Sequence, residues 1–189
     1  MNSKLFNKGN KTYRVTSQFG YRDLAVDNKD ISGYHIGVDY AYPQGTQLVS
    51  PLDVEILDVR TYGDYGGQIF AYAKDIDKTI HYAHVSKIDV KKGQTIKKGT
   101  VLGLSGGAKG THGAGLSTGA HLHLGLASGR VTDVIKGKYG DGKWNDPNKA
   151  NFNPKPNFNK VAEEVRNGDY GNEPHRTPNL KKKYPSLTD

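Results

Sequence analysis

Alternation between apolar and polar residues, with a period of two, dominates the middle of the chain. Residues 54–62, VEILDVRTY, alternate in this way and predict a half-buried strand. Residues 68–75 and 78–85 predict two further strands, and the short polar stretch at residues 75–77 predicts the turn between them. Together these segments predict an antiparallel meander.

Shorter strands and many turns surround this meander. Residues 13–22 predict a short strand that leads into a glycine turn, and residues 33–51 are interrupted by prolines and a glycine. Residues 90–107 hold two Lys-Lys-Gly turns between short strands. The fold class is therefore mainly β, with an antiparallel sheet or sandwich core, long glycine-rich loops around a groove and a short helical tail at the C-terminus.

Two histidines lie one residue apart in an apolar segment, GAHLHLGL, at residues 119–126. A long glycine-rich loop, residues 106–119, leads directly to it. Alternate residues of a strand project from one face, roughly 6.6 Å apart, so His121 and His123 point one way and the neighbouring leucines the other. Such a pair could share a metal, share a substrate or lie on a solvated surface, and the spacing alone does not decide.

Further histidines occur close to predicted strand ends. His35 and Asp39 would lie roughly 13 Å apart in an extended strand, so a shared ion requires a bend, for which Gly37 is a permissive position. His81 and His84 fall on opposite faces by alternation, so at most one is expected to point at a site shared with the others. Five of the seven histidines lie in three such clusters, which favours convergence on one site.

The amino-acid composition limits which metal ligands and which partners the chain can have. The chain has no cysteine, which excludes disulfides and thiolate ligands, so any zinc would be held by His, Asp or Glu. The net charge of +8 favours an anionic partner, but the basic residues form no stripe interleaved with aromatics, so we expect a wall polymer rather than a nucleic acid. No stretch is long enough to insert in a membrane, and the N-terminus has no apolar leader segment.

Five segments taken in order make the sequence recognisable: SQFGYR, YHIGVDYAYPQGT, VEILDV, IHYAHVSKIDVKKGQTIKKGTVLGLSGG and GAHLHLGL. Together they resemble the lysostaphin-type (LytM-like, M23) zinc endopeptidases of bacterial cell walls. The resemblance implies one Zn²⁺ per chain, held by His35, Asp39 and His123. It further implies that His84 and His121 are the catalytic histidines that flank the water. We expect His121 to act as general base and acid and His84 to orient the water or stabilise the oxyanion, although these roles could be exchanged.

Other residues near these motifs are candidates of lower rank. Tyr34 and Tyr82 adjoin predicted site histidines and could contact substrate, as could His112 in the glycine-rich loop. For His81 a solvated or hydrogen-bonded strand position is preferred over a supporting role behind the metal.

The chain beyond Arg130 loses the strand pattern. We expect an N-terminal arm at residues 1–12, the endopeptidase domain at 13–150, a linker at 151–158 and a helical segment at 159–189. Its helix would have Asn159 as N-cap and end near Gly168. This last segment faintly resembles the start of a phage-lysin cell-wall-binding repeat of the CW_7 type. It differs from that repeat in two prolines, where the repeat usually continues smoothly, and in its end at Asp189, before a final helix could form.

The expected function is hydrolysis of peptide bonds in peptidoglycan stems or cross-bridges. The missing leader and the lysin-like tail favour a phage endolysin, released from the host cytoplasm through a holin, or a virion-associated lysin. One alternative is a non-catalytic module of the same fold that binds peptidoglycan or activates another hydrolase. A basic nucleic-acid-binding barrel is a weaker alternative, because it leaves the His and Asp clusters unexplained.

Overall fold

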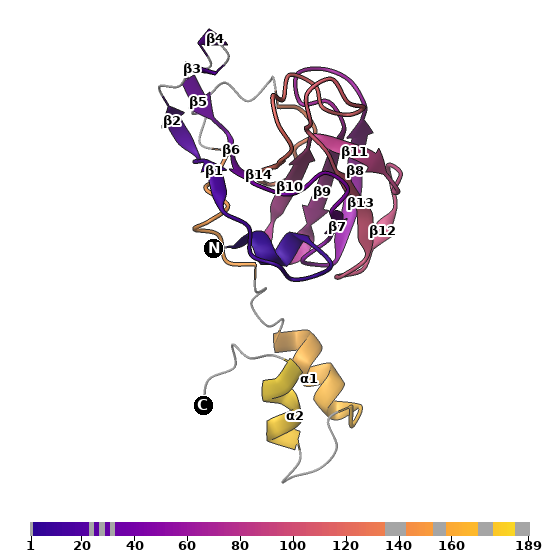
Figure 1. Ribbon diagram of the computed structural model, residues 1–189. Coiled ribbons are helices and arrows are strands. Elements are labelled where there is room, and N and C mark those ends of the chain that lie inside the picture. Colours follow the sequence, from indigo (N-terminus) through magenta and orange to yellow (C-terminus); the bar gives the residue numbers. More distant parts are fainter. Residues whose placement is uncertain are drawn as a thin grey trace. The chain divides into compact units, whose positions relative to one another are not determined.

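The computed structural model describes residues 2–22, 25–26, 29–30, 33–134, 143–152, 158–169 and 176–183. It divides the chain into two compact units, Met1–Ala150 and Asn151–Asp189. Short strands and turns make up nearly all of the first unit, whereas two helices make up the described part of the second (Figure 1). The prediction of a mainly β fold with a short helical tail is confirmed.

A seven-stranded antiparallel sheet forms the body of the first unit, in the order β1-β6-β14-β10-β9-β8-β12. Its strands are β1 (Val15–Ser17), β6 (Gly37–Tyr40), β8 (Val54–Arg60), β9 (Gln68–Ala73), β10 (Lys78–Ala83), β12 (Thr95–Ile96) and β14 (Leu122–Ser128). Strands β8, β9 and β10 are the predicted meander. The β9–β10 connection is a single 3-10 turn, η2 (Lys74–Ile76), which Asp77 closes with a φ of 48°.

Smaller elements complete the unit. A three-stranded sheet has the order β11-β13-β7, and two hairpins pair β2 with β5 and β3 with β4. Their bounds are β2 (Gly20–Arg22), β3 (Ala25–Val26), β4 (Lys29–Asp30), β5 (Gly33–His35), β7 (Gln47–Val49), β11 (Val85–Ile88) and β13 (Val101–Ser105). Figure 1 shows the β2–β5 hairpin next to β1 and β6, at one end of the large sheet.

The two faces of the large sheet carry different residues. On one face, Tyr82 of β10 pairs with Leu124 of β14, and both side chains are fully buried. The hydroxyl of Tyr82 donates a hydrogen bond to the carbonyl of Val49 in the three-stranded sheet, 3.2 Å away, so this face packs toward that sheet. On the other face His123 pairs with Asp39. The leucines of GAHLHLGL therefore enter the core while His123 leaves it, as the alternation predicts.

Residues 2–12 are part of this unit rather than a separate arm. They include the 3-10 helix η1 (Asn2–Phe6), in which Phe6 is fully buried and packs edge-on against Tyr82. The side chain of Asn7 donates a hydrogen bond to the hydroxyl of Tyr42, which in turn donates to the carbonyl of Ser3. Buried apolar surface and these polar contacts hold the segment in place.

The second unit contains α1 (Phe158–Arg166) and α2 (Arg176–Lys183). Asn159 lies inside α1, so it is not the N-cap that the sequence predicts. The helix does end where expected, because Gly168 follows it with a φ of 78°, a conformation that glycine adopts readily. The sequence analysis does not predict helix α2, in which Pro178 lies in the first turn, where proline costs no hydrogen bond. Lys183 forms an ion pair with Glu164 of α1 at 3.0 Å.

Among the described residues, no helix combines the length and the hydrophobicity that crossing a bilayer requires.

Candidate metal centre

Three potential metal ligands from three strands meet on the outer face of the large sheet. Cross-strand partners project from the same face, which places Asp39 of β6 beside His123 of β14. His35 ends β5, and Ile36 separates it from β6, so the chain bends as the shared site requires. The Nε2 atom of His35 lies 3.2 Å from Oδ1 of Asp39 and 3.0 Å from Nδ1 of His123. The Nδ1 of His123 lies 2.9 Å from the same Asp39 oxygen.

The chemistry of these atoms suits a zinc ion. In a tetrahedral site with bonds of about 2.0–2.1 Å, ligand atoms are roughly 3.3 Å apart, close to the three separations found here. The Nδ1–H of His35 donates to the carbonyl of Gln18 at 2.7 Å, so its Nε2 presents a lone pair. Asp39 can only accept when ionised. These two acceptors therefore face Nδ1 of His123, which can carry at most one proton, an arrangement that a cation stabilises.

Asp39 is held in its ionised form. Burial by itself raises the pKa of this carboxyl, but its close contacts with the rings of His123 and His35 act in the opposite direction, and the pKa lies well below its ordinary value. Arg22 also forms an ion pair with Asp39, with its Nη1 atom 3.9 Å from the other carboxylate oxygen. The same Nη1 donates to the hydroxyl of Ser17 at 2.7 Å.

Gly37 leaves room for the ring of His123. A Cβ atom at this position would lie 2.8 Å from Cε1 and Nε2 of His123 and 2.5 Å from the carbonyl oxygen of Leu124. The φ angle of Gly37 is not in the left-handed region. The glycine is therefore needed for close packing against the ligand, rather than for the bend that the sequence analysis assigns to it.

His84 and His121 lie next to the three ligands, with their ring centroids 4.5 Å apart. The Nδ1–H of His84 donates to the carbonyl of Ala114, and that of His121 to the carbonyl of Gly119, each at 2.8 Å. Both Nε2 atoms are therefore acceptors in the neutral rings, and that of His121 lies 3.8 Å from Oδ1 of Asp39. Burial, reinforced by the charges of the neighbouring histidines, lowers the pKa of His84 to about 3.

His81 and His84 both lie near His123, although alternation predicts that they project from opposite faces of the strand. The rings of His81 and His84 are centred 5.7 and 6.2 Å from that of His123. Strand β10 ends at Ala83, and His84 adopts a φ of 57°, which breaks the alternation of side chains. His81 is also fully buried rather than solvated, and its Nε2 is hydrogen-bonded to Oε1 of Gln68 at 3.1 Å.

The three candidate substrate contacts have different surroundings. Tyr34 is half-buried on β5, and its ring meets those of Phe19 and Tyr21 edge-on at 5.4 and 5.0 Å. His112 is exposed in the glycine-rich loop. Tyr82 is fully buried on the core face, and its hydroxyl is engaged as described above, which removes it from the residues that a substrate can reach in this structure.

Hydrogen bonds fix the glycine-rich loop beside His84. The amide of Gly67 donates to the carbonyl of Gly113 at 3.0 Å, and the amide of Leu116 donates to the carbonyl of Asp64 at 2.9 Å. An added Cβ atom at Gly66 would lie 2.1 Å from the carbonyl oxygen of Gly113, and one at Gly115 would lie 2.2 Å from that of Asp64, so the two loops approach too closely for side chains. This wall of the site is thus anchored to the β8–β9 connection.

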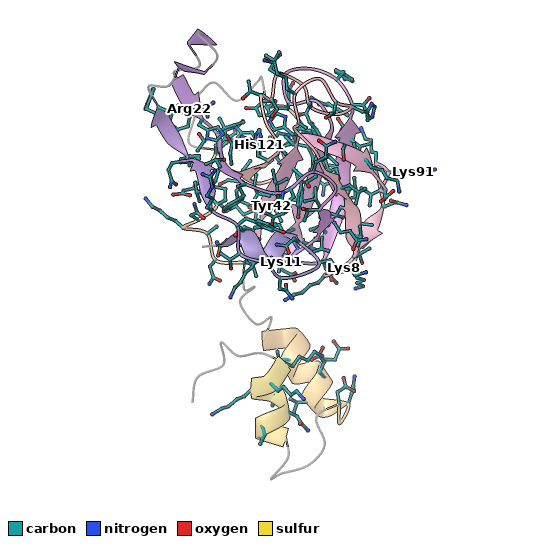
Figure 2. The ribbon with its side chains drawn as sticks, viewed as in Figure 1. Lys8, Lys11, Arg22, Tyr42, Lys91 and His121 are labelled. Carbon is teal, nitrogen blue, oxygen red and sulfur yellow. The ribbon has the colours of Figure 1, made fainter. Side chains whose placement is uncertain are left out.

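Sequence reasoning missed several residues around the site. Arg22, Ser17 and Gln18 contact the ligands from the N-terminal strands, and Tyr65 places its ring 4.9 Å from that of His123. Figure 2 shows the side chains, with Arg22 on the β2–β5 hairpin and His121 beside the large sheet. The motif SQFGYR contained the first three, but nothing in its pattern indicated that they would reach the ligands.

Comparison with known proteins places the geometry in context. The model of peptidase family M23 matches residues 33–138. Peptidoglycan DD-endopeptidase ShyA of Vibrio cholerae is 34% identical over 125 residues, which are 66% of this chain but only 27% of that protein. The chain therefore spans about a quarter of the length of this curated relative.

Two solved structures have a similar fold. The catalytic domain of the antimicrobial peptidase lysostaphin from Staphylococcus simulans superposes with a TM-score of 0.55 at 27% identity, covering 71% of this chain and 89% of that one. The catalytic domain of the prophage-encoded M23 protein EnpA from Enterococcus faecalis gives a TM-score of 0.53 at 25% identity, covering 72% and 90%.

Proposed function

The chain belongs to peptidase family M23, a family of zinc metallopeptidases, and from this premise we propose that it is an endopeptidase that hydrolyses peptide bonds in the stems or cross-bridges of peptidoglycan. One observation carries the proposal: three ligand atoms, on His35, Asp39 and His123, lie within 3.2 Å of one another beside two further histidines. Metal ligands without such neighbours would suit a structural site equally well.

The residues around the ligands have distinct roles in this reaction. A zinc ion held by His35, Asp39 and His123 would polarise the scissile carbonyl and would make water acidic enough to supply the nucleophile at neutral pH. His121 takes the proton of that water at Nε2, because its Nδ1–H stays on the carbonyl of Gly119. It then returns the proton to the leaving amine. His84, whose Nδ1–H stays on the carbonyl of Ala114, accepts a hydrogen bond at Nε2 and thereby orients the water.

Peptidoglycan is the substrate that the relatives favour. ShyA is described as a peptidoglycan DD-endopeptidase, and lysostaphin as an antimicrobial peptidase. The net charge of +8 would hold the protein near anionic polymers of the wall. Specificity for one bond depends on the shapes of the loops around the groove.

We further propose that the protein acts at the wall as a phage lysin, either released from the host cytoplasm with a holin or carried by the virion. Its likeness to the prophage-encoded EnpA domain supports this setting. In this proposal the helices α1 and α2 belong to a wall-binding segment at residues 159–189. Their basic residues, among them Lys181 to Lys183, suit an anionic wall.

Digestion of purified peptidoglycan, read by mass spectrometry, tests the enzymatic proposal. New amino termini should appear with the zinc-loaded protein, vanish with a chelator and return with added zinc, and the Asp39→Ala variant should release none. Zinc-loaded protein that sediments with several wall types but cleaves none of them would overturn the proposal in favour of a non-catalytic binding module.

A further inference from the structure

A layer of buried rings lies directly behind the proposed metal ligand His123. His81, on the neighbouring strand β10, is fully buried and stacks on Phe70 with centroids 4.5 Å apart. Its ring meets that of His123 at an interplanar angle of 67° and that of Trp144 at 62°, with the Trp144 centroid 6.2 Å away. A Cβ atom at Gly125 would lie 2.8 Å from Trp144 and 3.3 Å from His81, so this glycine leaves the space in which the rings meet.

Each of three contacting rings in this layer carries an unpaired nitrogen. Within the described residues, the buried side-chain nitrogens without a hydrogen-bond partner are Nδ1 of His81, Nε2 of His123 and Nε1 of Trp144. Buried polar atoms are nearly always paired, with protein or with an ordered water. Because the three unpaired nitrogens lie in rings that contact one another, one shared hydrogen-bond partner can account for all of them.

The protons on His81 follow from its surroundings. The carbonyl of Tyr62 can only accept, so the amide of Gln68 directs Nε2–H toward it, at 3.1 Å. The Oε1 atom of the same amide therefore faces His81 and must accept from the Nε2–H of that ring, also at 3.1 Å. A neutral imidazole carries one proton, so Nδ1 of His81 is a lone pair.

His123 differs from the other histidines of the site in how its proton is fixed. His35, His84 and His121 each donate Nδ1–H to a backbone carbonyl, on Gln18, Ala114 and Gly119 respectively. His123 instead turns Nδ1 toward the ligand cluster, so its proton belongs on Nε2, where no described residue accepts it. The Nε2–H of His123 therefore needs an acceptor. The ring of His81, whose Nδ1 is a lone pair, contacts the ring of His123.

We propose that His81 is a positioning residue for His123. One buried water accepts from Nε2–H of His123 and Nε1–H of Trp144 and donates to Nδ1 of His81. The resulting relay runs from the Tyr62 carbonyl through Gln68 and His81 to the metal ligand, and it fixes both the tautomer and the orientation of the His123 ring. The inference rests on the proposed zinc site, which the experiment below tests separately.

Zinc affinity, measured by competition with a chromogenic chelator on the full chain, tests the relay. His81→Leu keeps a similar volume but has no acceptor, and we expect about 10- to 100-fold weaker binding. His81→Asn offers an amide oxygen near the position of Nδ1 and should recover most of the affinity. Tyr82→Phe, a change on the same strand that faces the core, is the matched control and should bind zinc as the unchanged protein does. Equal affinity of His81→Leu and the unchanged protein, or equal losses in the two His81 variants, would overturn the inference.

A second measurement needs no variant. Long-range proton–nitrogen NMR correlation of the histidine-labelled, zinc-loaded protein reports which ring nitrogen carries the proton. We expect Nε2–H on both His81 and His123, and a proton on Nδ1 of His81 would refute the relay. Failure of the unchanged protein to bind zinc would instead refute the proposed function. Binding by that protein with no effect of His81→Leu would refute the relay alone.

Discussion

The close packing of Gly37 against His123 makes a small substitution there informative. In a Gly37→Ala variant the new Cβ would lie 2.5 Å from the carbonyl oxygen of Leu124 and 2.8 Å from two atoms of the His123 ring. Ordinary contacts of a Cβ atom begin near 3.4 Å. The backbone oxygen belongs to the strand pairing of β6 with β14 and cannot yield freely. The ring of His123 must therefore move by several tenths of an ångström, which changes the position of its ligand atom relative to the other two ligands.

Two effects of different size follow from that displacement. Overpacking of a closely packed position costs about 1–3 kcal/mol, which for a chain of this length lowers Tm by about 2–12 °C. Displacement of a ligand weakens metal binding by about 10- to 100-fold, as expected when a ligand loses its support. We therefore expect zinc affinity to fall by more than the loss of folding stability accounts for, because the added Cβ collides with the ligand His123 itself.

Calorimetry and chelator competition separate the two effects. Gly9→Ala is the matched control, because a Cβ there meets only side-chain atoms at 3.6 Å and beyond and no left-handed φ is involved. This control should leave both zinc affinity and Tm nearly unchanged. A Gly37→Ala protein that binds zinc as tightly as the unchanged chain would refute the argument that this glycine exists to admit the His123 ring.

Three further predictions follow from the site and the core. Asp39→Ala should abolish stoichiometric zinc binding, measured by elemental analysis after dialysis, because it removes one of three ligands and leaves two histidines; retained zinc would contradict the ligand assignment. His121→Ala should keep zinc within a few-fold but lower the rate of peptidoglycan cleavage by about 10²- to 10⁴-fold, the usual contribution of a general base; full activity would show that another group takes the proton. Burial raises the pKa values of Tyr40 and Tyr42, so they stay neutral in the fold while the unfolded chain ionises near pH 10. Because the unfolded state then binds fewer protons, stability should fall above pH 10 by about 1.4 kcal/mol per pH unit for each tyrosine, and denaturant titrations at pH 9 and 11 that gave equal stability would contradict this.

The strand pattern alone predicted much of the fold. Alternation in residues 54–85 identified the meander, and in residues 122–126 it separated the leucines, which are buried in the core, from His123. Both results depend on side chains of a regular strand changing face at every residue. Where the strands are regular, local sequence was sufficient.

The pattern failed where the backbone leaves regular geometry. His84 has a φ of 57°, uncommon for a residue other than glycine, and no feature of HYAHVS signals it. The burial of Phe6 and Asn7 depends on Tyr82 and Tyr42, which are distant in sequence. A local sequence pattern does not indicate which distant residues a segment will contact.

The sequence also cannot predict which ring nitrogen of a histidine is free to bind a metal, because that depends on where the ring proton lies. The sequence places a histidine at position 35, but the carbonyl of Gln18 determines that its Nδ1 is protonated and its Nε2 is free. The carbonyls of Ala114 and Gly119 likewise hold the proton of His84 and of His121 on Nδ1. Each of these acceptors is a backbone oxygen, which every residue has. The position of the ring proton therefore depends on which backbone oxygen the fold places beside the ring. Among the described residues no backbone oxygen accepts from the ring of His123, and in the relay that we propose its tautomer is determined by a side chain, His81.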